Sequence, residues 1–193
     1  MMAISFNKRC SQNYLFYTLS SIVLLTSACK ESDVVFVDNG LSNYQIVSSD
    51  TADAEETKAA KALQGYLKEM SGVSLPIVSE TDKQAAKGIW IGTTSKYKKL
   101  DLKENDITYR IIDEELIIAG GNPESTLNAV YTFLEYELGV RFYTPKAEVV
   151  PKMDRIMVSK VLNYNYTPEI TTRTVHSKLY YDNKEFADKR KVT

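Results

Sequence analysis

The sequence predicts an α+β fold, a two-layer sandwich in which two main helices cover one face of a mixed β-sheet of five to seven strands. Two long segments carry apolar residues at helical spacing, and short β-branched or alternating runs lie before, between and after them. Turn-prone Gly, Asp and Asn residues separate these runs, as is typical of short strands joined by tight connections.

The first predicted helix follows three candidate N-cap residues, Ser49, Asp50 and Thr51, and ends at Ser71-Gly72. Its apolar stripe consists of Ala59, Leu63, Tyr66, Leu67 and Met70. The predicted strands outside the hairpin are Val34–Val37, Tyr44–Val47, Leu75–Val78, Gly88–Gly92 and Val140–Tyr143. The run Gly88–Gly92 is apolar on both faces, which predicts a central position in the sheet.

A predicted hairpin precedes the second helix, with Ile107–Ile112 as its first strand and Leu116–Ala119 as its second. Gly120-Gly121 then leads to Asn122 as the N-cap and to Pro123 at the first helical position, where a missing N–H costs nothing. The apolar stripe of this helix consists of Leu127, Val130, Tyr131, Leu134 and Leu138.

Residues 1–29 have the layout of a bacterial export signal, with a basic start, an apolar stretch and small residues before Cys29. A cysteine after small residues resembles the lipobox of bacterial lipoproteins, in which the thiol is acylated. Thr26 stands where a lipobox usually has leucine, so a plain secretory signal is the alternative. The sequence therefore predicts export and a lipid anchor at Cys29 in the outer membrane. The charged linker 30–33 resembles a surface-export signal.

Composition argues against several function classes. The net charge is −1 and charges of both signs are mixed, so no basic face for nucleic acid is expected. Cys10 lies within the leader, which leaves no cysteine pair for a disulfide or a metal site in the mature chain. His176 is the sole histidine, and no nucleophile motif accompanies it. We therefore predict neither a metal nor a cofactor.

Three further features of the sequence are candidates for chemistry. The turn Gly120–Pro123 opens a helix but lacks the spaced glycines and the lysine of a nucleotide loop, so we interpret it as a turn and a cap. Glycosidases use paired carboxylates. However, Glu135 and Glu137 lie two residues apart on a helix and face different directions. Glu114 and Glu115 belong to a turn, and we predict that all four are solvated. No catalytic residue is predicted.

Tyrosines gather in the last third of the chain, where they predict either a carbohydrate surface or packing against a neighbouring domain. These residues are Tyr143, Tyr164, Tyr166, Tyr180 and Tyr181.

Several segments resemble a known family: YLKEMSGVSLPIV, GIWIG, LIIAGG, and NAVYTFLEYELGVRFYTP followed by VVP. Together they resemble the N-terminal domain of glycoside hydrolase family 67 α-glucuronidases and of related Bacteroides-type lipoproteins. They are also similar to the domain that precedes the barrel in β-hexosaminidases. The resemblance covers roughly residues 34–175 and is most specific between Leu116 and Pro151.

In those families the catalytic carboxylates come from a (β/α)₈ barrel that follows this domain. The resemblance thus implies a non-catalytic accessory domain at 34–163 and a loose segment 164–193 that begins a missing barrel. It implies the barrel as the partner. We predict that Arg141, Phe142 and Tyr143, at the end of the last strand, form part of the contact. Two alternatives stay open, a free-standing carbohydrate-binding lipoprotein and, third, an independent hydrolase with two close carboxylates.

Overall fold

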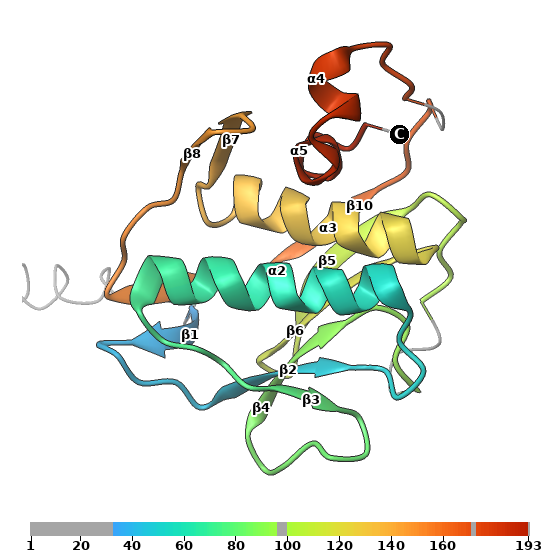
Figure 1. Cartoon of the computed structure of the whole chain (residues 1–193). Helices are drawn as coiled ribbons and strands as arrows, with labels where there is room; N and C mark the ends of the chain where they lie inside the picture. Colours follow the sequence, from blue (N-terminus) through green and yellow to red (C-terminus); the bar gives the residue numbers. More distant parts are fainter. Residues whose placement is uncertain (1–32, 96–99, 171–172, 193) are drawn as a thin grey trace, which may run out of the picture. The chain divides into compact units, whose positions relative to one another are not determined.

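The computed structural model describes residues 33–95, 100–170 and 173–192 (Figure 1). The predicted export signal and Cys29 lie outside these ranges, as does the linker up to residue 32. Within them, no helix combines the length and the apolar character that crossing a bilayer requires.

Six strands form the main sheet: β2 (Tyr44–Ser48), β3 (Ile77–Ser79), β4 (Lys87–Ile91), β5 (Ile107–Ile112), β6 (Glu115–Gly120) and β10 (Asn163–Tyr166). Their spatial order is β10-β5-β6-β4-β2-β3. The β2–β3, β2–β4 and β4–β6 pairs are parallel, whereas β5 pairs with β6 and with β10 in the antiparallel sense. The mixed sheet, the hairpin and the central position of β4 are confirmed.

Two small antiparallel sheets complete the strands among the described residues. One joins β1 (Val34–Asp38) to β9 (Arg155–Val158), and the other joins β7 (Arg141–Thr144) to β8 (Ala147–Val149). Both segments predicted as strands here, 34–37 and 140–143, are present with small shifts at their ends. Because β8, β9 and β10 have three or four residues each, their alternation is too short to stand out in the sequence.

The helices α2 (Ala54–Ser71) and α3 (Pro123–Tyr136) lie side by side over one face of the main sheet (Figure 1). Asp53 caps α2, accepting hydrogen bonds from the backbone N–H groups of Glu55 and Glu56 at 2.9 Å each. The predicted caps at residues 49–51 instead form a turn before the helix. Gly72 ends α2 with φ +79°, as its sequence position predicts. The two-layer α+β sandwich is confirmed.

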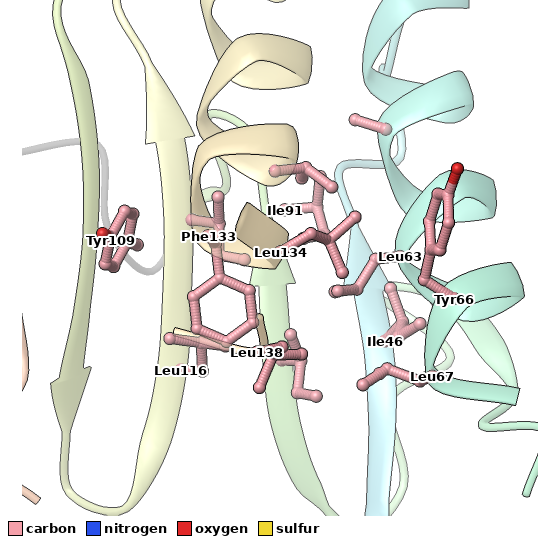
Figure 2. Packing of buried hydrophobic residues seen from close by; sticks show 14 of the residues in the cluster. Ile46, Leu63, Tyr66, Leu67, Ile91, Tyr109, Leu116, Phe133, Leu134 and Leu138 are labelled. Atoms are coloured by element: carbon pink, nitrogen blue, oxygen red, sulfur yellow. The ribbon is translucent and has the colours of Figure 1, made fainter. Parts of the chain in front are cut away.

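The core lies between these helices and the sheet (Figure 2). Its fully buried side chains come from both layers and include Ile46, Leu63, Leu67, Ile91, Leu116, Phe133, Leu134 and Leu138. Burying each large apolar side chain contributes about 1.5–3 kcal/mol. On the opposite face of the sheet a smaller cluster contains Val47, Trp90 and Ile117.

The prediction that residues 164–193 are loose is wrong for the elements that the structure describes there, because they pack against the domain. The predicted boundary after residue 163 cuts through β10, which belongs to the main sheet. Two short helices follow, α4 (Lys178–Tyr181) and α5 (Lys184–Lys189), and α5 lies against α3 (Figure 1). Phe186 is only 5% exposed and stacks on Tyr180 with a centroid distance of 5.5 Å. The segment therefore has a packing partner in the domain itself.

Candidate functional site

The turn before α3 is a structural cap. A Cβ at Gly121 would overlap the carbonyl oxygen of Lys103, and one at Gly120 would overlap the backbone at Ser125. The Asn122 side chain accepts from the Ser125 N–H at 2.7 Å, and the Thr126 hydroxyl accepts from the Gly120 N–H at 3.0 Å. The glycines are thus required by close approach of the chain, and the interpretation as a turn and a cap is confirmed.

The prediction that Glu115 is a solvated turn residue is wrong. It begins β6 and is 7% exposed. Its carboxylate accepts from the Gly88 N–H and from Trp90 Nε1, both at 2.9 Å, and lies 3.4 Å from the Lys83 ammonium group. Glu114, by contrast, has a side chain that is 45% exposed, and it pairs with Lys87 and Lys160. The buried carboxylate therefore ties β4 to β6 on the face of the sheet that carries Trp90.

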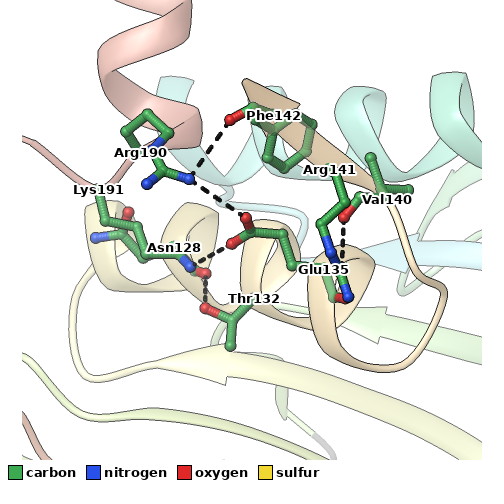
Figure 3. Close-up of polar contacts among 8 residues, drawn as sticks. All are labelled: Asn128, Thr132, Glu135, Val140, Arg141, Phe142, Arg190 and Lys191. Carbon is green, nitrogen blue, oxygen red and sulfur yellow. Dashed lines mark hydrogen bonds and ion pairs between the residues drawn. The ribbon is translucent and has the colours of Figure 1, made fainter. Parts of the chain in front are cut away.

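Glu135 and Glu137 point to different partners, as their spacing predicts. The Glu135 side chain is only 13% exposed, because Lys191 at 2.9 Å and Arg190 at 3.7 Å cover its carboxylate (Figure 3). Glu137 accepts from the Tyr109 hydroxyl at 3.0 Å. Burial and this carboxylate raise the pKa of Tyr109. The prediction of a solvated surface is therefore wrong for Glu135, which holds the C-terminal segment.

The residues that the structure describes contain no group of three or more His, Cys, Asp or Glu side chains suited to hold a metal ion. His176 is exposed, and its Nδ1 lies 3.2 Å from the Tyr181 hydroxyl.

The predicted barrel-contact residues at the β7–β8 hairpin divide into two groups. Phe142 is 3% exposed and packs edge-on against the rings of Tyr66 and Tyr131, at centroid distances of 5.7 and 5.6 Å. Because it is buried in the domain's own core, it is not available to another domain. Arg141 is exposed and donates to the carbonyl oxygens of Val140 and Glu135, whereas Tyr143 is 64% exposed.

Lys189 of α5 packs over buried aromatic rings beside this hairpin. Its ammonium group lies 3.0 Å from Glu148 of β8 and 2.8 Å from Glu185, above the rings of Tyr66 and Phe142. Burial alone lowers the pKa of Lys189, but its hydrogen bonds to Glu185, Tyr66 and Glu148 raise it above its usual value. The lysine thus remains charged and anchors α5.

A groove with a volume of about 290 Å³ runs along α3. One wall is the helix stripe Glu124, Asn128, Thr132 and Tyr136, whose members recur every fourth residue and so share a face. The other wall is formed by Tyr164, Tyr166, Ile170 and Arg173.

Two of the groove's tyrosines are fixed by ring contacts. Tyr164 stacks on Tyr109 with a centroid distance of 4.5 Å and an interplanar angle of 4°, and it meets Tyr136 edge-on at 6.0 Å. Of the tyrosines singled out from the sequence, Tyr164 and Tyr166 line this groove, whereas Tyr143, Tyr180 and Tyr181 lie elsewhere. Tyr136 was missed as a site residue because its partners come from a distant strand.

Comparison with known proteins supports the fold. No family model and no curated protein sequence matches the chain. A β-N-acetylhexosaminidase of family GH20 from Streptomyces coelicolor A3(2) is similar in structure, with a TM-score of 0.52 and 13% identity. The match covers 75% of this chain and 25% of that enzyme. The fold therefore also occurs within a glycoside hydrolase, as a quarter of its length.

Two further solved structures have lower scores. A family GH115 4-O-methyl-α-glucuronidase with specificity for decorated arabinogalactans has a TM-score of 0.47 and 13% identity, covering 74% of this chain and 19% of that one. A mutant Streptomyces plicatus β-hexosaminidase in complex with its product GlcNAc has a TM-score of 0.49 and 11% identity, covering 75% of this chain and 25% of that one. The resemblance to family 67 stays a prediction.

Proposed function

We propose that this chain is a non-catalytic accessory domain of a glycoside hydrolase that acts in glycan degradation, of the α-glucuronidase or hexosaminidase-like kind. The observation that carries the proposal is the fold shared with the GH20 enzyme, of which this chain matches 25%. Since fold alone does not fix function, the carboxylates supply a second argument. Glu115, Glu135 and Glu137 are all engaged with partners inside the domain.

The role we assign to the domain is to brace a catalytic (β/α)₈ barrel. The β7–β8 hairpin presents Tyr143, 64% exposed, and Val149, 52% exposed, beside the exposed Arg141. We assign these exposed side chains to the contact with the barrel. Phe142 supports the hairpin from inside instead of contacting the barrel.

The direct genetic test is to read the gene beyond the codon for Thr193. The proposal predicts an in-frame segment of about 250 residues with alternating strand and helix patterns, the length of a barrel. A gene that ends there, in a genome with no separately encoded barrel that binds this chain, would contradict the bracing role.

We further propose that the mature chain is exported and anchored to the outer membrane through lipid on Cys29. Cells that express the chain and are fed a labelled fatty acid should label it, and Cys29→Ala should abolish the label. Label retained in Cys29→Ala would contradict the anchor.

A second candidate function, a free-standing carbohydrate-binding lipoprotein, is favoured by the exposure of Tyr136 (65%) and Tyr166 (42%) beside the groove. It predicts sugar binding by a protein whose gene encodes no barrel. The gene downstream of Thr193 therefore separates the two candidates.

A further inference from the structure

The groove along α3 combines aromatic faces with side chains that donate and accept hydrogen bonds. We propose that it binds a neutral sugar unit of a glycan, with the sugar ring against tyrosine and its hydroxyls held by both walls. Bracing a barrel requires no sugar site, so this inference goes beyond the accessory role, and it specifies the site and the class of sugar for the second candidate function. The proposed sugar site consists only of residues that the structure describes.

The aromatic part of the groove is arranged before any ligand binds. Tyr164 is held between Tyr109 and Tyr136 by ring contacts at 4.5 and 6.0 Å. Tyr136 and Tyr166 remain 65% and 42% exposed. A tyrosine offers a flat apolar face and a polar hydroxyl, which suits a sugar ring because its C–H face is apolar and its rim is polar.

The polar part offers both hydrogen-bond roles. Asn128 supplies an amide, which donates and accepts, and Glu124 supplies a carboxylate, which accepts. Arg173 lies on the opposite wall, where its guanidinium donates to the Tyr166 hydroxyl at 3.5 Å. Sugar hydroxyls also donate and accept, so this mixture matches them better than it matches a ligand that only accepts.

Charge balance in the groove favours a neutral ligand. Glu124 and Arg173 carry opposite charges on opposite walls, and Lys191 is already paired with Glu135 at 2.9 Å. The groove therefore has no excess positive charge for a phosphate or a uronate. Its volume of about 290 Å³ lies at the lower end of the range for small-molecule sites, which suits one or two sugar units.

The test titrates the purified chain with xylo-, cello-, manno- and uronic-acid oligosaccharides in an isothermal calorimeter. We expect at least one neutral series to bind with Kd of about 1 mM or tighter. Tyr166→Ala should weaken that binding about ten-fold, and Asn128→Ala about five-fold. Tyr181→Ala removes a tyrosine that is 68% exposed but lies outside the groove, and it should bind like the parent. Thermal unfolding checks that all variants fold.

Three results would overturn the assignment. The first is that no neutral series binds at about 10 mM. The second is that Tyr166→Ala and Tyr181→Ala weaken sugar binding equally. The third is that the uronic-acid series binds more tightly than every neutral series. None of them bears on the accessory role, which the downstream gene tests. Conversely, a missing barrel would leave the sugar site intact.

Discussion

At the scale of single residues, the most informative side chain is Glu115, because a buried carboxylate persists only with hydrogen-bonding partners. Gly88 N–H and Trp90 Nε1 supply them at 2.9 Å each, and Lys83 supplies the opposite charge. This arrangement makes Glu115 a structural group, although a turn of acidic residues gives no sign of it in the sequence.

Glu115→Ala should lower the free energy of unfolding by about 3 kcal/mol, because it removes the buried carboxylate that accepts from the Gly88 N–H and from Trp90 Nε1. Glu115→Gln should cost less, about 2 kcal/mol, since its amide oxygen accepts one of the two hydrogen bonds, whereas its amide nitrogen faces the other donor. Urea unfolding followed by circular dichroism measures both. Glu114→Gln, at the neighbour whose side chain is 45% exposed, is the control and should unfold like the parent. Equal effects at positions 114 and 115 would contradict this account.

At the scale of secondary structure, sequence reasoning succeeded where a pattern was long. Helices α2 and α3 span 18 and 14 residues, so their apolar stripes repeat over several turns. The hairpin β5–β6 was predicted from its alternating pattern, and the central strand β4 from its continuous apolar run. The helices α4 and α5 have four and six residues and depend on tertiary contacts, which a single sequence does not display.

The candidate groove was predictable only in part for the same reason. Its helical wall recurs at residues 124, 128, 132 and 136, a spacing visible in the sequence. Its other wall includes β10, which pairs with β5 across more than 50 intervening residues. That pairing places Tyr164 and Tyr166 beside Tyr136. A strand as short and polar as β10 does not reveal its pairing partner in the sequence.

The docking of α5 gives a prediction at this scale. Phe186→Ala removes a ring that is 5% exposed and should cost about 3 kcal/mol locally. Because a helix of six residues does not hold alone, amide hydrogen exchange should accelerate across Lys184–Lys189 while α2 and α3 keep their protection. Leu179→Ala, at a site 46% exposed on α4, is the control. Unprotected α5 amides in the parent chain would contradict the packing described.

At the scale of the whole molecule, buried tyrosines make stability sensitive to alkali. Burial raises the pKa of Tyr44 and Tyr66 to about 12, and it also raises the pKa of Tyr109 and Tyr131. Unfolded tyrosine has a pKa of about 10. Above that pH the unfolded chain releases protons that the native chain retains, so the free energy of unfolding decreases as the pH rises.

Stability should therefore stay level below about pH 10 and fall as the pH rises through about 12. Each such tyrosine contributes a slope of up to about 1.4 kcal/mol per pH unit. Urea unfolding at a series of pH values measures the slope, and Tyr66→Phe should reduce it. A variant with the parent's slope would show that Tyr66 does not carry the effect.

The central claim at this scale is that the domain is a scaffold and breaks no glycosidic bond itself. The most direct measurement incubates the purified chain with chromogenic aryl glycosides, including α-glucuronides and N-acetyl-β-glucosaminides, and follows release of the aryl group. The account predicts no release above the buffer blank. Release that disappears when one carboxylate of the chain is replaced by its amide would contradict it.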